Sequence, residues 1–208
     1  MTDAILFDVD GTLWDTTDLV AHAWNMGAKE LGAKPKEPIT GDRLKKEFGK
    51  PMDIIVDNLF PGESKEMQGK ILRVCCKHEH RILEETKEHL LYPGVEDTIR
   101  ALSKVCKVCI VSNCQKGYIE LFLKKSGLGG YVTDYESFGN TGLSKGENIR
   151  LVVERNQIEH GIYVGDTKGD YDAAAFAGVP FVLARYGFGH VPEAGAGIDS
   201  IGQILGFA

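Results

Sequence analysis

The sequence lacks the features that would place the protein in a membrane, on nucleic acid or in the secretory pathway. No run of about 18 apolar residues suggests a membrane span. The N-terminus has neither the basic region nor the long apolar region of a signal peptide. With a net charge of −6 and no lysine- or arginine-rich block, nothing favours binding to nucleic acid or to an anionic membrane. We therefore predict a cytoplasmic protein, which we expect to be a monomer or a weak dimer.

Cysteine is scarce, and its odd count predicts reduced thiols rather than disulfides in a chain with no sign of secretion. Cys106 and Cys109 form a C-x-x-C pattern, but they lie in a segment that is typical of a strand. Residues three apart on a strand point to opposite faces, which disfavours a redox or zinc role. The cluster "CCKHEH" at 75–80 lacks a second ligand pair with zinc-site spacing, so an ordinary helix is favoured there.

Short apolar runs alternate with helical patterns along much of the 208-residue chain. The apolar runs lie at 4–7, 107–113, 161–166 and 179–184, and the helical patterns lie at 94–105, 117–127, 147–157 and 171–178. Continuous apolar strands that alternate with helices are typical of a parallel sheet buried on both faces. We predict an α/β fold, a doubly wound (Rossmann-like) parallel sheet.

Residues 16–90 interrupt this alternation, because they contain helical patterns and no strand pattern. We predict an all-helical domain at 16–90, inserted into a core formed by 1–15 and 91–208. The insert leaves the core at the carboxyl end of the first strand, where α/β sheets bind their ligands. A domain that starts there could close over such a site.

Polar residues follow three of the predicted strands at the point where each strand ends. They are Asp8 and Asp10, then Ser112 and Asn113, then Asp166 and Asp170. The carboxyl ends of parallel strands face one way, so the four carboxylates should converge and repel one another, at a cost that burial increases. Such an arrangement needs a cation, and all-oxygen ligation suits Mg²⁺.

Mg²⁺ that is bound in this way usually lies beside a phosphate group. Ser112 and Asn113 offer hydrogen-bond donors, and the turn amides after a strand can form an anion-binding nest. Lys145 precedes a predicted helix and can supply a positive charge. The pattern predicts Mg²⁺, a phosphate, a carboxylate nucleophile and a second carboxylate that moves a proton.

The motifs occur in the order found in the haloacid dehalogenase (HAD) superfamily, and the chain resembles its phosphoglycolate-phosphatase-like hydrolases with a helical C1-type cap. The matching segments are D-x-D-G-T at 8–12, Ser112-Asn113, Lys145, G-D-T-x-x-D at 165–170 and the segment 177–180. One position departs from the pattern: Gly146 follows the lysine where relatives often carry proline. This departure bears on the substrate subgroup rather than on the chemistry.

The resemblance implies a role for each motif residue. Asp8 is the nucleophile and forms an aspartyl-phosphate, while Asp10 protonates the leaving alcohol and then activates water. Mg²⁺ is held by the Asp8 carboxylate, the Asp10 backbone carbonyl and Asp166, with Asp170 as a further ligand or as the partner of one. The transferring phosphoryl group is held by Ser112, Asn113 and Lys145.

The leading hypothesis is a Mg²⁺-dependent phosphomonoesterase that acts on a small phosphorylated metabolite. A phosphomutase of the β-phosphoglucomutase type is the alternative, with a sugar hydroxyl instead of water as the acceptor. Two non-enzyme alternatives, a phospho-aspartate receiver and a silent binding protein, are disfavoured. A receiver carries its phosphorylated aspartate on a later strand and lacks the insert, and the complete motif set argues against a silent protein.

The helical insert is expected to set substrate specificity. Phe48, Gly49 and Lys50 resemble the specificity loop of the cap in their position, although the basic stretch around them also fits a solvated helix face. Trp14 directly follows the first motif and is expected either to line the pocket or to pack at the hinge.

Overall fold

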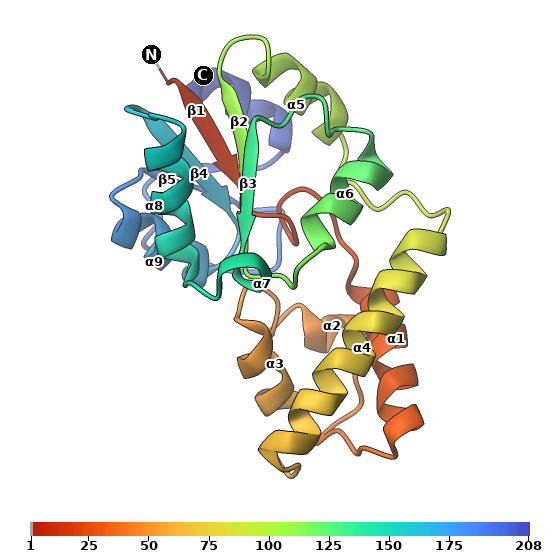
Figure 1. Cartoon of the computed structure of the whole chain (residues 1–208). Helices are drawn as coiled ribbons and strands as arrows, with labels where there is room; N and C mark the ends of the chain where they lie inside the picture. The colour runs from red at the N-terminus through yellow and green to blue at the C-terminus, as the bar shows by residue number, and fades with distance from the viewer. Residues whose placement is uncertain (1) are drawn as a thin grey trace. The chain divides into compact units, whose positions relative to one another are not determined.

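The computed structural model describes residues 2–208 and divides the chain into two compact units (Figure 1). The first unit combines Met1–Asp15 with Leu90–Ala208, and the second is the segment Thr16–His89. The polypeptide therefore leaves the first unit just after its first strand and returns to it some 75 residues later. Each unit is described by itself.

The first unit is built on a parallel sheet, which in the described residues has six strands in the order β3-β2-β1-β4-β5-β6. The strands are β1 (Ala4–Phe7), β2 (Lys107–Ser112), β3 (Asp134–Ser137), β4 (Gly161–Gly165), β5 (Phe181–Ala184) and β6 (Gly197–Ile198). The predicted α/β fold with a parallel, Rossmann-like sheet is confirmed.

Helices cover the sheet because its strands are apolar on both faces. On one side, Leu6 of β1 packs in a cluster with Ile149 and Val152 of α8 (Lys145–Arg155) and Ala174 of α9 (Lys168–Ala177). On the opposite side, α5 (Val95–Leu102) packs against η1 (Ile201–Phe207) (Figure 1). All four residues of β1 are fully buried, which is expected for the central strand of a covered parallel sheet.

The register of the strands brings their carboxyl ends to the same edge. Phe7, the last residue of β1, pairs with Ile110 of β2 and with Val164 of β4. The residues that follow these positions therefore leave the sheet side by side. Asp8 comes directly after β1, and Asp166 directly after β4.

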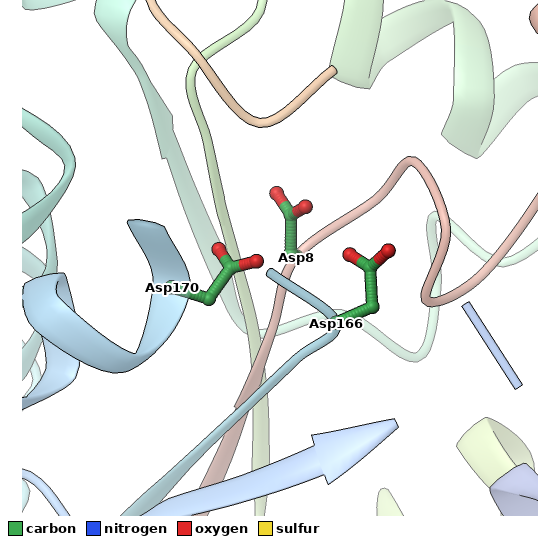
Figure 2. A group of neighbouring side chains, drawn as sticks. All are labelled: Asp8, Asp166 and Asp170. Atoms are coloured by element: carbon green, nitrogen blue, oxygen red, sulfur yellow. The ribbon is translucent and has the colours of Figure 1, made fainter. Parts of the chain in front are cut away.

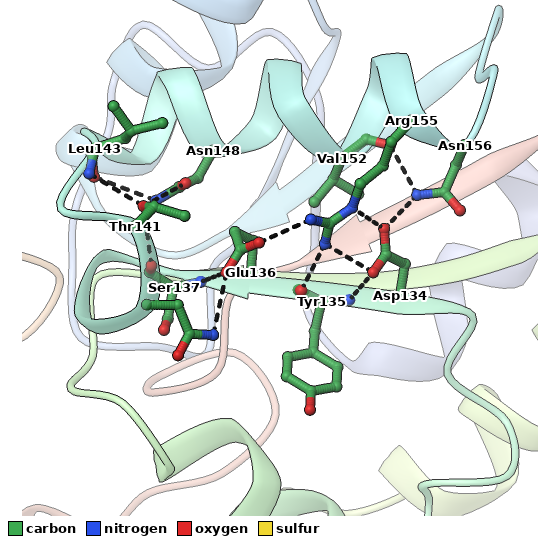
Figure 3. A network of polar contacts seen from close by, with 11 residues as sticks. Asp134, Tyr135, Glu136, Ser137, Thr141, Leu143, Asn148, Val152, Arg155 and Asn156 are labelled. Carbon is green, nitrogen blue, oxygen red and sulfur yellow. Dashed lines mark hydrogen bonds and ion pairs between the residues drawn. The ribbon is translucent and has the colours of Figure 1, made fainter.

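The edge strand β3 is polar and is fastened to α8 by an ion-pair network (Figure 3). Arg155, at the end of α8, binds Asp134 from Nε and Nη2 at 2.5 and 2.7 Å, and binds Glu136 from Nη1 at 2.8 Å. It also donates to the carbonyl oxygen of Tyr135 at 2.8 Å. The strand has no apolar run, but two sets of contacts hold it in place. It pairs with β2 on its inner side, and Arg155 ties it to α8.

At the other end of the same strand, hydrogen bonds tie α7 (Phe138–Thr141) to α8 (Figure 3). The Thr141 hydroxyl donates to Asn148 at 2.8 Å, and the Asn148 side-chain amide donates to the Leu143 carbonyl at 3.2 Å. Ser144 then caps α8, with Glu147 as its partner in a capping box. These contacts fix the first turn of α8, which begins at Lys145.

The second unit consists of α1 (Thr17–Leu31), α2 (Gly41–Leu44), α3 (Met52–Leu59) and α4 (Lys65–Glu85). A close approach of α1 to α4 requires glycine, since a Cβ on Gly27 would lie 2.8 Å from the Cys75 sulfur. The Trp24 indole donates to the buried Glu79 carboxylate at 2.7 Å. The "CCKHEH" segment is thus an ordinary stretch of α4. No helix within residues 2–208 has the length and apolar character needed to cross a membrane.

Candidate active site

Three aspartates meet at the carboxyl edge of the sheet in the first unit (Figure 2). Asp8 follows β1, Asp166 follows β4, and Asp170 lies in the first turn of α9. One carboxylate oxygen from each lies within 4.8 Å of the others, and all three residues are buried. No other group of His, Cys, Asp or Glu within residues 2–208 brings three metal-ligating atoms together in this way.

Lys145 is the cation that faces this cluster. Its Nζ lies 3.0 Å from Asp8 Oδ1 and 2.6 Å from Asp170 Oδ1, and the side chains of all three residues are at most 3% exposed. The other oxygen of Asp170 accepts from the backbone amide and the hydroxyl of Thr167, at 3.0 and 2.6 Å. Both oxygens of Asp170 are therefore held by groups of the protein itself.

Asp166 is held on one side only. Its Oδ2 accepts a 2.6 Å hydrogen bond from the backbone amide of Phe188, whereas its buried Oδ1 has no hydrogen-bond partner among the described residues. Glycines enclose this side chain: a Cβ on Gly11 would lie 2.2 Å from Asp166 Oδ2, and one on Gly187 would lie 2.3 Å from Asp166 Cβ. Gly11 also has a φ of 80°, so the turn after β1 favours glycine for two reasons.

The electrostatics of the cluster show an unbalanced negative charge. Burial raises the pKa of Asp8 to about 6, and the charge of Asp170 adds to this, although Lys145 and a hydrogen bond from Ser112 oppose it. Burial and the charges of Asp170 and Asp8 likewise raise the pKa of Asp166 well above its usual range. Burial alone would lower the pKa of Lys145, but Asp170 and Asp8 outweigh it and raise that pKa.

The cluster meets the requirements of a small divalent cation. Three carboxylates against one ammonium leave an excess of two negative charges when all are ionised. The donors are all oxygens, which Mg²⁺ prefers, and the unpartnered Oδ1 of Asp166 is available for ligation. A buried acceptor without a partner is costly in a protein interior, and a metal ion would remove that cost.

The predicted phosphate-binding residues lie in the same unit. Ser112 ends β2, is buried, and makes the hydrogen bond to Asp8 noted above. Asn113 follows it and is half-buried. The Asp8 carboxylate therefore accepts hydrogen bonds from two side chains, Ser112 and Lys145.

Asp10 lies away from the three-carboxylate cluster, on the turn after β1. Its Oδ1 accepts hydrogen bonds from the Trp14 indole at 3.0 Å and from the Tyr118 hydroxyl at 2.7 Å. The two aspartates have different surroundings, because the Asp8 carboxylate accepts from Lys145 and the Asp10 carboxylate accepts from Trp14 and Tyr118. Trp14 is 1% exposed and packs inside the first unit.

The residues proposed for specificity lie in the second unit. Phe48, Gly49 and Lys50 form the turn between α2 and α3, where Gly49 has a φ of 86°. Lys50 pairs with Glu47 at 2.8 Å. Their role stays a prediction.

Three groups at the site were not predicted from the sequence: Thr167, Tyr163 and the Phe188 amide. Thr167 forms a capping box with the predicted Asp170 at the start of α9, which the T-x-x-D spacing signals. The Tyr163 hydroxyl donates to the Val111 carbonyl at 2.8 Å and lies 3.4 Å from Asp170 Oδ1. Tyr163 and the Phe188 amide reach the site only through tertiary packing, and no local pattern marks them.

Comparison with known proteins gives matches along most of the chain. The family model described as haloacid dehalogenase-like hydrolase matches residues 5–184. A phosphoglycolate phosphatase from Aquifex aeolicus is 28% identical over 189 residues, which cover 88% of this chain and 85% of the relative. One from Rhodobacter capsulatus is 26% identical over 200 residues, which cover 92% of this chain and 88% of the relative.

Solved structures show the same fold. The crystal structure of a predicted phosphoglycolate phosphatase from Haemophilus somnus superposes with a TM-score of 0.85 at 18% identity, covering 99% of this chain and 97% of that one. At this identity the likeness concerns the fold alone. The resemblance predicted from the ordered motifs is nonetheless confirmed by the family match and the curated relatives.

Proposed function

Because the chain belongs to the haloacid dehalogenase-like hydrolase family, we propose that it is a Mg²⁺-dependent phosphomonoesterase that works through a phosphorylated Asp8. The observation that carries this proposal is the buried cluster of Asp8, Asp166 and Asp170, opposed by the single charge of Lys145. A protein has little reason to bury such an excess of charge unless a cation and an anionic substrate complete the site.

The chain's own residues supply a complete set of roles for the first step. Asp8 lies at the end of a rigid central strand, and attack by its carboxylate oxygen on phosphorus forms one O–P bond as the bond to the leaving oxygen breaks. Asp10 gives its proton to that oxygen. In the second step Asp10 takes a proton from water, the water oxygen bonds to phosphorus, and the bond to Asp8 breaks.

Charge neutralisation is the main task in phosphoryl transfer. We assign to Lys145, Ser112 and Asn113 the binding of the phosphoryl oxygens, since Lys145 and Ser112 already contact the Asp8 carboxylate. When bound, Mg²⁺ would neutralise negative charge on the phosphoryl group.

We also assign different roles to the two aspartates of the G-D-T-x-x-D motif, on the basis of their contacts. Asp166, with its unpartnered Oδ1, is the proposed direct metal ligand beside the Asp8 carboxylate and the Asp10 backbone carbonyl. Asp170 is held at both oxygens and binds Lys145 at 2.6 Å. We therefore assign to Asp170 the positioning of Lys145.

The names of the curated relatives support a choice of candidate substrate. The curated relatives are named phosphoglycolate phosphatase, so 2-phosphoglycolate is the first candidate for this chain. We keep the proposal that the unit Thr16–His89 is a cap that sets specificity, with Phe48, Gly49 and Lys50 as its candidate residues. Lys50→Ala is then expected to raise KM for the substrate with little change in kcat, as steady-state kinetics would show.

We also keep the predictions of a monomer or weak dimer and of a cytoplasmic location. The supporting observation for the location is that all five cysteines are free thiols, as is usual in a reducing compartment.

The test is a screen of small phosphorylated metabolites, including 2-phosphoglycolate, with release of inorganic phosphate as the readout. We expect turnover that EDTA abolishes and added Mg²⁺ restores. A sugar phosphate that is isomerised without release of phosphate would instead identify a phosphomutase. A folded protein that turns over no phosphate ester, p-nitrophenyl phosphate included, would refute the proposal.

A further inference from the structure

The carboxyl group of Asp10 is clamped by two aromatic hydrogen-bond donors. The Trp14 indole N–H and the Tyr118 hydroxyl both donate to the same oxygen, Oδ1, at 3.0 and 2.7 Å. The donors come from different parts of the first unit. Trp14 lies on the turn after β1, and Tyr118 is the first residue of α6 (Tyr118–Ser126), which follows β2.

Both donors are rigidly placed. Trp14 is 1% exposed and Tyr118 is 2% exposed. The two rings pack edge to face, with centroids 5.5 Å apart and an interplanar angle of 76°, and Trp14 packs in the same way on Phe122 at 5.0 Å. The backbone of the turn adds to this, because the Trp14 amide donates to the Val9 carbonyl at 3.2 Å and the Trp14 carbonyl accepts from the Gly11 amide at 2.9 Å.

An aspartate on a turn needs such a clamp to hold one orientation. The χ2 torsion of aspartate is broad, so its carboxyl plane is set by its contacts and not by rotamer preference. Proton transfer requires a donor oxygen within hydrogen-bond distance of the acceptor, and a displacement of 1 Å can cost about 100-fold in rate. Fixing Oδ1 from two directions also fixes the direction of Oδ2.

The clamp differs in chemistry from the contacts of the neighbouring aspartates. Asp8 and Asp170 are held by the ammonium group of Lys145. The two aromatic donors to Asp10 are instead neutral N–H and O–H groups, which orient the carboxyl group.

We propose that Trp14 and Tyr118 are positioning residues that hold the Asp10 carboxyl group in line with the leaving oxygen of the substrate. The inference rests on the proposed function, in which Asp10 gives its proton to that oxygen. It goes beyond that function by naming the two side chains on which the proton transfer depends.

The experiment compares two substrates that differ in their need for a proton. p-Nitrophenyl phosphate releases a stabilised phenolate, whereas phenyl phosphate releases a strongly basic one and depends on a general acid. The readout is kcat/KM, which reports the steps up to cleavage of the ester bond. For variants that carry Asp10→Asn, the single-turnover rate of phenol release, divided by the substrate concentration under subsaturating conditions, takes its place. Tyr118→Phe removes one hydroxyl and keeps the ring, so it is the principal variant.

We expect Tyr118→Phe to lower kcat/KM for phenyl phosphate about tenfold, and for p-nitrophenyl phosphate less than about twofold. Trp14→Phe should show the same selectivity. In an Asp10→Asn background, Tyr118→Phe should cause no further loss, because the group that it positions has gone. A hydroxyl with a merely structural role would lower both substrates equally and would still act in that background.

Two control variants match these changes. Tyr131→Phe removes a hydroxyl from a tyrosine of the same unit that is 37% exposed, and it should leave both rates unchanged. Trp24→Phe removes an indole that also donates to a buried carboxylate, that of Glu79. It is expected to affect stability without any selectivity between the two substrates.

The outcomes separate this inference from its premise. No turnover of p-nitrophenyl phosphate by the native protein, or an equal loss of both substrates in Asp10→Asn, overturns the proposed function and the inference with it. Selective loss in Asp10→Asn together with unselective or absent loss in Tyr118→Phe overturns the clamp alone. Selective loss in both supports it.

Discussion

The two ends of helix α8 each carry a cation that binds two carboxylates, but the two clusters differ in what they leave unsatisfied. At the start of the helix, Lys145 meets Asp8 and Asp170 in a site where no side chain is more than 3% exposed. At its end, Arg155 meets Asp134 and Glu136 with exposed fractions of 37%, 22% and 10%. The first cluster is sealed from water, and the second is in contact with it.

The comparison teaches how to separate a functional cluster from a structural one. Arg155 uses its planar group to bind Asp134 through two nitrogens, and Asn156 donates to the same carboxylate, so the edge strand is fully tied to α8 (Figure 3). The Lys145 cluster retains Asp166, with a buried oxygen that has no partner in the described residues, and two aspartates with raised pKa values. Unsatisfied, buried charge marks the site that requires a ligand.

The largest effect should come from removal of the proposed nucleophile. Asp8→Asn keeps the shape of the side chain but replaces the attacking oxygen, so phosphatase activity should fall by at least about 10⁴-fold. Thermal unfolding of the variant should show a folded protein. Substantial turnover of p-nitrophenyl phosphate by this variant would remove Asp8 from its assigned role.

Loss of the cation at the start of α8 should be the next largest effect. Lys145→Met removes the ammonium group that faces Asp8 and Asp170, and we expect kcat/KM to fall about 10²- to 10³-fold. Lys145→Arg is a matched control for charge, and its larger planar group should restore little activity at so enclosed a position. Near-native activity in Lys145→Met would show that the cluster's charge does not serve the reaction.

Stability should respond to Mg²⁺ in a pH-dependent way. Without a cation, the raised pKa of Asp8 means that the folded state retains a proton that the unfolded state has lost. The contribution of Asp8 to the free energy of unfolding is therefore fully present below about pH 4, where the carboxyl group is protonated in both states. It is lost as the pH rises through about 6, because the buried group then ionises. Mg²⁺ needs the ionised carboxylates, so it should stabilise the protein by about 2–3 kcal/mol at a hundredfold excess over its Kd near pH 7.5, and by much less near pH 5.

Thermal unfolding with Mg²⁺ and with EDTA at the two pH values measures this difference. Asp166→Asn should abolish the response to Mg²⁺, whereas Arg155→Gln should keep it. A Mg²⁺ response that is equal at both pH values, or one that persists in Asp166→Asn, would contradict the assignment of the cation to this cluster.

The smallest effect is expected at the other end of α8. Arg155→Gln breaks a partly exposed network, so it should cost about 1 kcal/mol of stability and lower Tm by a few degrees. Activity should be unchanged, because the hydrogen bonds of Arg155 go to Asp134, Tyr135 and Glu136 of the edge strand. A hundredfold loss of activity in Arg155→Gln would contradict the interpretation of the Arg155 cluster as purely structural.

The central strands could be predicted from the sequence because burial on both faces leaves a continuous apolar run. Such runs mark β1, β2, β4 and β5 to within two residues at either end. The edge strand β3 reads "DYES" and has no apolar run. Its structure comes from pairing with β2 and from the side chain of Arg155, which is 18 residues away from the nearer end of the strand.

The same division holds for the candidate site. Parallel strands end at one edge, so the sequence places Asp8, Ser112 and Asp166 there without knowledge of side-chain positions. The aromatic clamp on Asp10 depends on the packing of Tyr118 against Trp14, 104 residues apart in the sequence, and no local pattern encodes such a contact. The turn amide of Phe188 escapes prediction for the same reason.

The most direct test of the account is a search for phosphate on Asp8 itself. The Asp10→Asn variant should still accept a phosphoryl group from p-nitrophenyl phosphate in the presence of Mg²⁺, but it should not release that group to water. After acid quenching and digestion, mass spectrometry is expected to find one phosphoryl group on the peptide that contains residues 4–15, at Asp8. An unmodified Asp8 in samples that have released one equivalent of p-nitrophenol, or a phosphoryl group on another residue, would contradict the covalent mechanism.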